Sequence, residues 1–309
     1  MKTAFLINPT ILHYKKILHS IENEFNGMNY EIFVSEYHGH FMKLCDDVLS
    51  KGFTNLIAVG GDGTLNEVLN GTIHYFSQNK TVDFESLRKI KIGVLPCGSG
   101  NDFVRNFSQE FDVKHLKINI QNNSFESIDI GKCTFQNEKR EEETRYFINI
   151  ADLGMGAETM KVKEKIPVWS GAKFRYFFSI LSTLLVYKKK ELQLISNDFE
   201  WKGKCLNLVV ANGKYFGNGL GIAPKASVSD GKFDITVVGN ISLVDYALNI
   251  GKVKKSKPLE HREIHYFKGK SFEVKTLSGE EALIDIDGEV SGFSPAKFEI
   301  LEKTVNFIV

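Results

Sequence analysis

Cysteine, tryptophan and proline are scarce in this sequence, which has 4, 2 and 6 of them in 309 residues. The cysteines stand far apart and form no Cys-x-x-Cys pair; they are Cys45, Cys97, Cys133 and Cys205. This spacing excludes the usual zinc motifs and gives no sign of a disulfide framework. It is typical of a protein from a reducing cytoplasm.

Long hydrophobic runs are also lacking. The longest uncharged apolar stretch, Tyr176–Tyr187, has 12 residues, whereas a helix that crosses a bilayer needs about 20. The N-terminus has one lysine, a short apolar run and no small-residue cleavage site, so it does not resemble a signal peptide. We therefore expect a cytoplasmic protein without a membrane-spanning helix.

An excess of charge of one sign is absent as well, because 39 Lys and Arg face 38 Asp and Glu. The charge is unevenly placed, however: residues 161–190 hold eight basic residues and one acid, and residues 252–270 hold seven and two. Such segments are either solvated basic faces or a surface for an anionic partner. No nucleic-acid-binding motif accompanies them, so we expect no nucleic-acid partner.

Length and composition indicate a folded protein of two domains, with 42% hydrophobic and 25% charged residues. Helix-length segments separate four strand-like runs, which predicts a parallel sheet with crossover helices; the runs are Ala4–Ile7, Tyr30–Ser35, Asn55–Val59 and Ile90–Leu95. Shorter, alternating runs follow, as in an antiparallel sheet. We predict an α/β domain over residues 1–126, on which 301–309 packs back, and a β-rich domain over 127–300 that contains helices at Lys173–Tyr187 and Ser242–Val253.

Two glycine-rich turns carry the functional signal. The first, Gly60-Gly61-Asp62-Gly63-Thr64, follows the apolar run Leu56–Val59 and precedes a helical pattern. Glycines before a helix expose backbone N–H groups that phosphate oxygens can approach. The second, Gly98-Ser99-Gly100-Asn101-Asp102, follows the next strand. Two such turns after neighbouring parallel strands open on one carboxyl edge, where ligands bind.

Together, these turns resemble the catalytic domain shared by diacylglycerol kinases and sphingosine kinases, and the whole chain resembles the bacterial soluble diacylglycerol kinase family. Further motifs in the family's order support this resemblance: Asn8-Pro9, Ser35-Glu36 with Gly39-His40, Asp152–Glu158, Ala223–Ala226 with Ser229–Asp234, and Asp285–Glu289. The chain departs from the family by serines at 35 and 99, by Cys97, and over residues 161–190, which do not align.

The resemblance implies ATP as the phosphoryl donor. It places the nucleotide along Asn8, Ser35, Gly61, Asp62, Gly63, Thr64, Leu65, Asn66, Glu67 and Ser99. The residue types agree, because they supply backbone donors, hydroxyls and an amide. Asp62 is suited to position Mg²⁺ on the phosphates through water.

A second metal position is implied in the loop after Pro224. The family binds a structural Mg²⁺ through an aspartate and neighbouring carbonyls, which here correspond to Asp230, Ser227 and Lys232. Oxygen ligands of this kind suit Mg²⁺. Without the resemblance, Asp230-Gly231 would indicate an ordinary hairpin turn.

The acidic segment Leu283–Glu289 alternates, which predicts that Asp285, Asp287 and Glu289 point to one face of a strand. Three carboxylates on one face repel unless a cation, a proton or water relieves them. The resemblance places the general base in the final Asp-Gly-Glu, hence at Glu289 or Asp287. Asp62 is a third candidate, by likeness to the sphingosine kinases.

The implied function is an ATP-dependent lipid kinase that phosphorylates a lipid hydroxyl, that of diacylglycerol above all, to give phosphatidic acid. The second domain would carry the lipid-acceptor side. Two alternatives remain: a soluble-substrate kinase of the NAD kinase or phosphofructokinase type, which shares Gly-Gly-Asp-Gly and a similar three-layer first domain, and a non-catalytic lipid- or nucleotide-binding protein of the same fold. The Gly-Ser-Gly-Asn-Asp-Phe turn and the Asp-Gly-Glu end disfavour the first, and the acidic residues disfavour the second.

A lipid substrate requires contact with a membrane. The segment Lys173–Lys190 combines aromatic residues and leucines with flanking bases, as in a helix that lies in the interface. We therefore expect peripheral association with the inner face of the membrane, with Lys188, Lys189 and Lys190 attracted to anionic lipid. A helix of the protein core is the alternative, and the sequence leaves a homodimer open.

Overall fold

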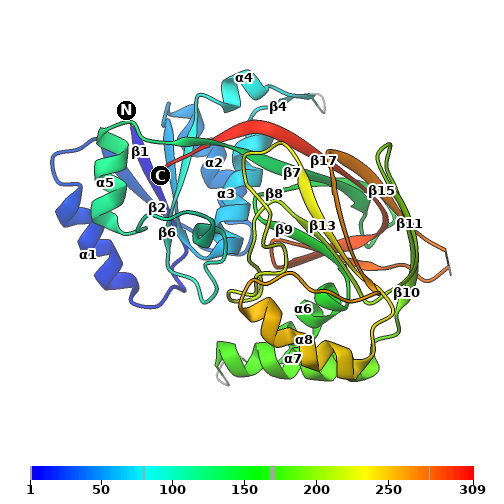
Figure 1. Cartoon of the computed structure of the whole chain (residues 1–309). Coiled ribbons are helices and arrows are strands. Elements are labelled where there is room, and N and C mark those ends of the chain that lie inside the picture. Colours follow the sequence, from blue (N-terminus) through cyan, green and yellow to red (C-terminus); the bar gives the residue numbers. More distant parts are fainter. Residues whose placement is uncertain (1, 79–80, 168–170, 278) are drawn as a thin grey trace. The chain divides into compact units, whose positions relative to one another are not determined.

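A computed structural model of the chain describes residues 2–78, 81–167, 171–277 and 279–309 (Figure 1). The chain divides into two compact units, one of Met1–Ile130 with Glu302–Val309 and one of Gly131–Leu301. The sequence placed this boundary at residue 126 and assigned 301–309 to the first domain. Among the described residues, no helix is both long enough and apolar enough to span a membrane.

The first unit alternates strands and helices. Its elements are β1 (Thr3–Ile7), α1 (Tyr14–Glu24), β2 (Tyr30–Val34), α2 (His40–Ser50), β3 (Asn55–Gly60), α3 (Asp62–Tyr75), β4 (Ser77–Gln78), β5 (Thr81–Val82), α4 (Phe84–Leu87), β6 (Lys91–Pro96), the 3₁₀ helix η1 (Phe103–Asn106), α5 (Val113–Gln121) and the start of β7 (Glu126–Gln136).

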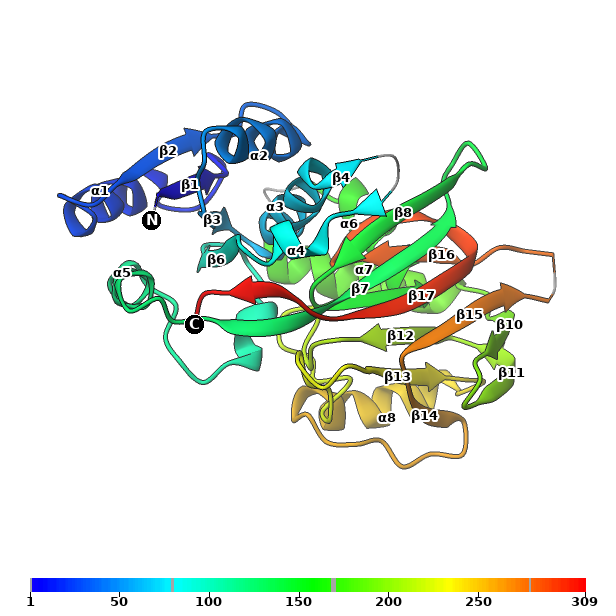
Figure 2. The ribbon, with the colours of Figure 1, turned by 90° about the horizontal axis from the view of Figure 1, so that it is seen from above.

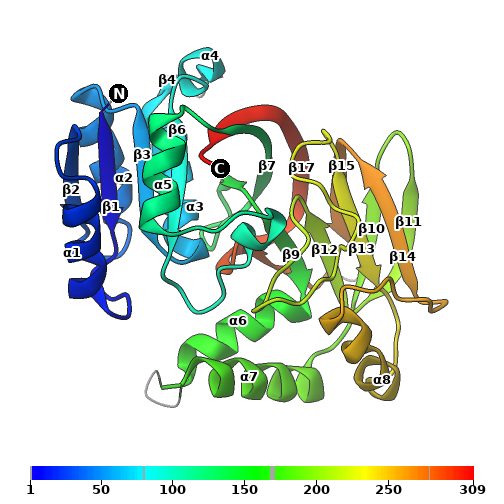
Figure 3. The same ribbon diagram turned by 60° about the vertical axis from the view of Figure 1, so that its left-hand side comes forward.

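The sheet of the first unit is parallel, in the order β2-β1-β3-β6, and the end of β17 (Glu289–Phe307) pairs in parallel with β6. Helices α1 and α5 cover one face and α2 and α3 the other (Figure 3). Ile21 of α1 and Ile120 of α5 pack with Phe5 and Ile57 in one core. Strands β1 and β3 are buried along their whole length, as expected for a sheet covered on both faces. The predicted three-layer α/β domain is confirmed.

The second unit is mainly antiparallel β structure. Its elements are the rest of β7, β8 (Glu142–Phe147), β9 (Ile150–Gly154), α6 (Met155–Lys165), α7 (Ala172–Val186), β10 (Lys190–Ile195), β11 (Glu200–Cys205), β12 (Asn207–Ala211), β13 (Phe233–Val238), α8 (Leu243–Lys254), β14 (Ile264–Gly269), β15 (Ser271–Thr276), β16 (Leu283–Ile286) and most of β17.

Strands of the second unit follow the order β14-β13-β12-β9-β16-β17, and β15, β10 and β11 continue from β17. Their inward side chains form a core that contains Phe147, Phe233, Phe272 and Phe298. Figure 2 shows β12 and β13 beside each other, with α8 next to them. The predicted β-rich second domain is therefore confirmed.

A second core of this unit lies on the other side of β12 and β13. Leu206, Val209 and Val238 form it together with Val253 of α8, and Leu184 of α7 packs against it. Both predicted helices of the domain are present, because α7 and α8 start and end within one residue of the predicted bounds.

Candidate active site

Four predicted nucleotide-binding positions follow strands of the parallel sheet at its carboxyl edge. The register pairs Ile7 with Val34 and Val59, and Val59 with Leu95. Neighbouring strands therefore end level with one another, and Asn8, Ser35, Gly61 and Ser99 come just after β1, β2, β3 and β6. Backbone bonds hold the edge: Asn8 N donates to Val59 O at 3.1 Å, and Cys97 N donates to Gly60 O at 2.7 Å.

The two glycine-rich turns touch each other backbone to backbone. A Cβ on Gly61 would lie 3.1 Å from Gly98 Cα, and a Cβ on Gly98 would overlap Gly61 Cα. Gly61 is also the residue that precedes α3, so the first N–H groups of that helix open next to the contact. Only glycines allow this approach, which leaves room for phosphate oxygens beside the helix N-terminus.

Asp62 joins the two turns through its carboxylate. Oδ2 accepts a hydrogen bond from Asp102 N at 3.0 Å, and Oδ1 accepts one from Phe103 N at 3.1 Å. Asp62 is also the first residue of α3, where the helix dipole favours negative charge. Each oxygen keeps a second lone pair. A carboxylate fixed in this way can accept water, or hold a cation through water, without rearrangement.

The other predicted residues of this turn lie deeper. Leu65 and Asn66 are buried, and Asn66 Oδ1 accepts from Asn70 Nδ2 at 3.1 Å. The Thr64 side chain lies against Gly60, where a Cβ would overlap its hydroxyl. Glu67 Oε1 is 3.8 Å from Nδ1 of His38, in the loop after β2. These side chains therefore support the turn from within the protein. In contrast, Asn8 Oδ1 accepts hydrogen bonds from Thr10 N and Thr10 Oγ1 in its own loop.

Asp102 and Asn101 are residues of this site that were not assigned a role from the sequence. Asp102 is buried, with Oδ1 3.3 Å from Arg105 Nε. A Cβ on Gly100 would lie 3.3 Å from the Oδ2 atoms of both Asp62 and Asp102, so the two carboxylates flank that glycine. Asn101 Oδ1 accepts from Gly98 N at 2.9 Å and closes the turn. The sequence feature that could have identified both residues is the Asn-Asp pair that directly follows Gly-Ser-Gly in the second glycine-rich turn.

In the second unit, Asp287 occupies the tight turn between β16 and β17. It has a φ of 49° and is followed by Gly288 with a φ of 90°, the two positive values of a type I′ hairpin turn. Its carboxylate accepts hydrogen bonds from Ile148 N at 2.9 Å, Asn149 N at 3.1 Å and Ile150 N at 2.9 Å. Asp287 therefore binds this turn to the first residue of β9 and to the two residues before it.

The prediction that Asp285, Asp287 and Glu289 share one face of a strand is wrong. Strand β16 ends at Ile286, and the turn breaks the alternation before β17 begins at Glu289. Asp285 is buried, whereas Glu289 is part-exposed, and its Oε2 accepts from Arg145 Nη2 at 2.8 Å. Arg145 also donates to Ser291 Oγ at 3.0 Å. Both acids of the final motif are part-exposed, but Asp287 accepts three backbone N–H groups, whereas Glu289 accepts from a side chain.

Asp152 and Asp285 form a buried carboxyl pair that was not predicted from the sequence. They face each other in the register of β9 and β16, and both are almost fully buried. Asp285 Oδ1 accepts from Gly288 N at 2.9 Å, but Asp285 Oδ2 and Asp152 Oδ1 have no hydrogen-bond partner among the described residues. Burial raises the pKa of Asp285 to about 7, and burial together with Asp285 raises that of Asp152. The pair therefore retains a proton near neutral pH.

The predicted metal loop brings a second carboxylate to Asp230. Lys268 Nζ lies 2.8 Å from Asp230 Oδ2 and 3.2 Å from Asp234 Oδ2, while Lys232 N donates to Asp230 Oδ1 at 3.2 Å. Burial raises the pKa of Asp234, which Lys268 opposes. Two carboxylates that converge on one ammonium are a donor set for a cation, so the residues fit a bound Mg²⁺ if the exposed Lys268 moves aside.

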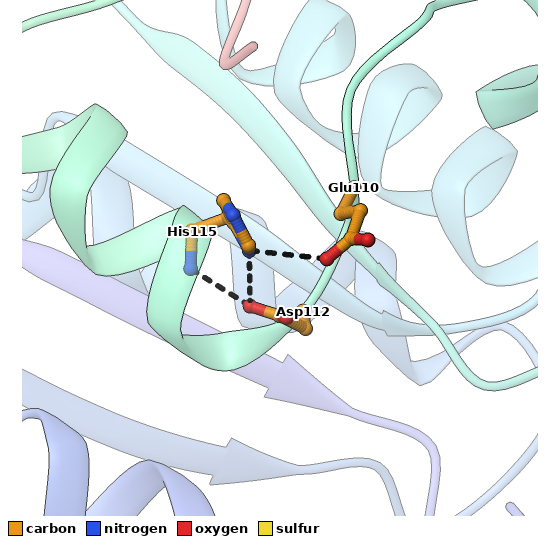
Figure 4. Close-up of side chains that lie close together, drawn as sticks. All are labelled: Glu110, Asp112 and His115. Carbon is orange, nitrogen blue, oxygen red and sulfur yellow. Dashed lines mark hydrogen bonds and ion pairs between the residues drawn. The ribbon is translucent and has the colours of Figure 1, made fainter.

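A third acidic cluster lies before and within α5. Glu110, Asp112 and His115 bring three potential ligand atoms within 4.8 Å of one another (Figure 4). Asp112 caps α5 by accepting from His115 N at 2.8 Å, and this bond lowers the pKa of Asp112. Capping and ion pairing account for the cluster, and we assign no metal to it.

Comparison with known proteins identifies both units. Residues 2–133 match the family model of the diacylglycerol kinase catalytic domain, and residues 149–309 match that of the YegS C-terminal NAD kinase beta sandwich-like domain. The diacylglycerol kinase of Bacillus subtilis is 26% identical, with 100% of this chain and 97% of that protein covered. That of Staphylococcus carnosus is 27% identical, with 83% and 77% covered.

A solved structure shares the fold. The crystal structure of a diacylglycerol kinase from Bacillus anthracis superposes with a TM-score of 0.69 at 20% identity, and covers 99% of this chain and 96% of that one. At this identity the likeness shows the architecture alone. It agrees with the α/β unit and the β-rich unit described above.

Proposed function

The chain belongs to the bacterial soluble diacylglycerol kinase family and is a lipid kinase; we propose that it transfers the γ-phosphoryl group of ATP to the free hydroxyl of diacylglycerol. The observation that carries the proposal is the Asp62 carboxylate, which joins two glycine-rich turns at the carboxyl edge of a parallel sheet. Backbone N–H groups at the start of α3 would bind phosphate oxygens there.

The first unit would bind and orient the nucleotide. Gly61 and Gly98 admit a phosphate close to the backbone, and Ser35 and Ser99 offer hydroxyls for phosphate or ribose. Asp62 would hold Mg²⁺ through water, and the ion would neutralise the charge that develops on the phosphates. Phosphoryl transfer is mainly a matter of position and charge, so a rigid cradle of this kind is what the reaction needs.

The second unit would supply the base. The acceptor hydroxyl loses its proton to Glu289, its oxygen bonds to the γ-phosphorus, and the bond between that phosphorus and the β–γ bridging oxygen breaks to release ADP. Arg145 holds one oxygen of Glu289 and so orients the carboxylate. Asp287, with three backbone N–H donors on its carboxylate, would position the turn. A second Mg²⁺ would be held by Asp230 and Asp234, with the predicted carbonyls of Ser227 and Lys232, and would stabilise the loop before β13.

The test is a phosphoryl-transfer assay with radiolabelled ATP and a panel of acceptors in detergent micelles: diacylglycerol, monoacylglycerol, sphingosine, ceramide and phosphatidylglycerol. Soluble NAD and fructose 6-phosphate test the alternative kinases. We expect label in phosphatidic acid that requires Mg²⁺. Preferential transfer to another acceptor would overturn the choice of diacylglycerol, and no transfer to any acceptor would contradict catalysis itself.

A further inference from the structure

Helix α7 exposes many of its large apolar side chains. For a helix that packs on a protein core in water, the apolar side faces inward. In α7 the small polar residues Ser179 and Thr183 are the buried ones, with 0% and 2% exposure, whereas Phe177 and Leu185 are 66% and 68% exposed. Leu184 packs on the core of this unit, but burial there does not explain the exposed aromatic and aliphatic side chains of the helix.

Helix α8 adds to the same surface. Figures 1 and 3 both show α7 and α8 below the strands of the second unit, and residues of both helices pack on one core. Leu248 of α8 is 73% exposed. We call the exposed side chains of the two helices the apolar face; they are Phe174, Phe177, Phe178, Leu181, Leu185 and Val186 of α7 with Val244 and Leu248 of α8.

Lysines accompany the apolar face. Exposed lysines stand on α6, after α7, and at and after the end of α8; they are Lys161, Lys165, Lys188, Lys252, Lys254, Lys255 and Lys257. The prediction for Lys188–Lys190 needs correction, because Lys189 Nζ donates to Asn240 Oδ1 and Lys190 pairs with Glu280. Of that triplet, only Lys188 is exposed. Four of the exposed lysines, Lys252, Lys254, Lys255 and Lys257, stand at or after the end of α8.

We propose that the apolar face docks the enzyme on an anionic lipid bilayer, with its phenylalanines and leucines inserted at the level of the headgroups and the lysines on lipid phosphates. Shallow apolar insertion and basic residues are together the two signals that stable interfacial binding requires. A second copy of the chain is a poorer occupant, because lysine is depleted in protein interfaces. The inference deepens the proposed function, since diacylglycerol stays in the bilayer and the enzyme must reach it there.

The surface is also connected to the acidic turn within the second unit. Arg175 of α7 donates to Lys163 O of α6 at 2.9 Å, and a Cβ on Gly288 would lie 3.7 Å from Met160 of α6. Helix α6 thus contacts both the docking helix and the turn that precedes Glu289. Docking through α7 would hold the second unit in a defined orientation to the lipid acceptor.

The test measures sedimentation with vesicles of phosphatidylglycerol and phosphatidylcholine in equal parts, without ATP. We expect Phe177→Ser and Leu185→Ser each to lower the partition coefficient about tenfold. Leu181→Ser, compared with Leu277→Ser, is a matched test, because these leucines are 44% and 41% exposed; only the first should weaken binding. Equal binding by these two variants would overturn the apolar contribution.

A second vesicle experiment tests the contribution of the lysines by comparing two double variants. Lys254→Gln with Lys255→Gln should weaken binding about tenfold in low salt and hardly at all in high salt. Lys275→Gln with Lys297→Gln removes the same charge from β15 and β17 of the same unit and should leave binding unchanged. Equal losses in the two double variants would contradict the lysine contribution.

Two further measurements distinguish membrane docking from dimerisation and docking from catalysis. Analytical ultracentrifugation should give the same mass for the wild type and Phe177→Ser; a dimer that this variant dissociates, with vesicle binding unchanged, would show that a second copy covers the face. Activity on micellar diacylglycerol should be kept by all these variants. Vesicle binding without any kinase activity would refute the proposed function and leave the docking surface standing, and the reverse result would refute the surface alone.

Discussion

Asp62 follows a central strand of the first unit and Asp285 lies within a central strand of the second, and the two carboxyl groups have opposite surroundings. Asp62 starts a helix, is partly exposed, and receives a backbone N–H on each oxygen. Asp285 is buried opposite another carboxyl group, and its Oδ2 has no hydrogen-bond partner among the described residues. Backbone donors orient the Asp62 carboxylate, whereas burial and a like neighbour raise the pKa values of Asp285 and Asp152 and favour a proton on the pair.

This difference indicates which acid is suited to bind a metal ion and which acids are suited to hold a proton. A carboxylate that two backbone donors orient at the phosphate edge is already placed to bind Mg²⁺ through water. A buried pair with a raised pKa cannot hold a metal at the same cost, because the proton must leave first. The acidic residues of this chain are therefore not equivalent, although the sequence shows them only as Asp and Glu.

The largest effect is expected for Asp62→Asn. The substitution keeps the shape of the side chain but removes its charge, and we expect phosphoryl transfer to fall about a thousandfold. One of the two N–H donors loses its acceptor, so the variant should lose about 1–2 kcal/mol of stability and remain folded. Initial rates and thermal melting measure the two effects. Asp47→Asn, on the exposed side of α2, is the control, and a variant that keeps more than a tenth of the wild-type rate would refute the role of Asp62.

A second experiment should distinguish the catalytic role of Glu289 from the structural role of Asp287. Glu289→Gln keeps an acceptor for Arg145 but cannot take a proton, so kcat should fall about a hundredfold with little change in melting temperature. Asp287→Asn leaves one acceptor oxygen for three backbone N–H groups and should cost about 2 kcal/mol of stability. The opposite pattern, with activity tied to Asp287 and stability to Glu289, would reverse the assignment of the base.

Part of this fold could be read from the sequence because the signals are local. The predicted runs Ala4–Ile7 and Asn55–Val59 are strands within one residue of the predicted bounds, and α7 is displaced by one residue from the predicted helix. The glycine-rich turns were found for the same reason, since a strand, a glycine pair and a helix start are contiguous. Such features depend on neighbours in the chain and hardly on the rest of the molecule.

Other parts depend on contacts that no short segment reveals. Helix α6 was missed because its first residues, Met155–Glu158, belong to the segment Asp152–Glu158 that was assigned to a family motif. Strand β11 was missed because Glu200–Cys205 alternates charged and other residues at an exposed edge. The alternation at Asp285–Glu289 led to the wrong prediction that the three acids share one face of a strand, because a turn with two positive φ values interrupts the strand. The Asp152 and Asp285 pair requires the register of β9 and β16, which joins residues far apart in the chain.

The metal loop allows a smaller effect to be measured. If Asp230 and Asp234 bind Mg²⁺ when Lys268 moves aside, saturating Mg²⁺ should stabilise the wild type by about 2 kcal/mol through mass action. Asp230→Ala should lose most of this shift and some activity, whereas Lys268→Met should keep the shift or increase it, because the competing ammonium is gone. Melting curves over a Mg²⁺ series test this. Identical Mg²⁺ shifts in the wild type and Asp230→Ala would place the metal elsewhere.

The smallest effect concerns the buried pair and its dependence on pH. The pKa of Asp285 is about 7 in the folded protein against 3.8 for an ordinary aspartate, so the folded state binds this proton more tightly than the unfolded state. Its contribution to stability is therefore complete below pH 4 and is lost as the pH rises through 7.

Asp285→Asn removes the titration, and its amide can donate to Asp152, so the variant should gain about 1 kcal/mol over the wild type at pH 8 and show a flatter decline of stability between pH 5 and 8. Asp198→Asn, an exposed acid of the same unit, should leave the wild-type slope unchanged. Denaturant unfolding at a series of pH values measures both slopes, and an equal decline in Asp285→Asn and the wild type would mean that the proton is not held by this pair.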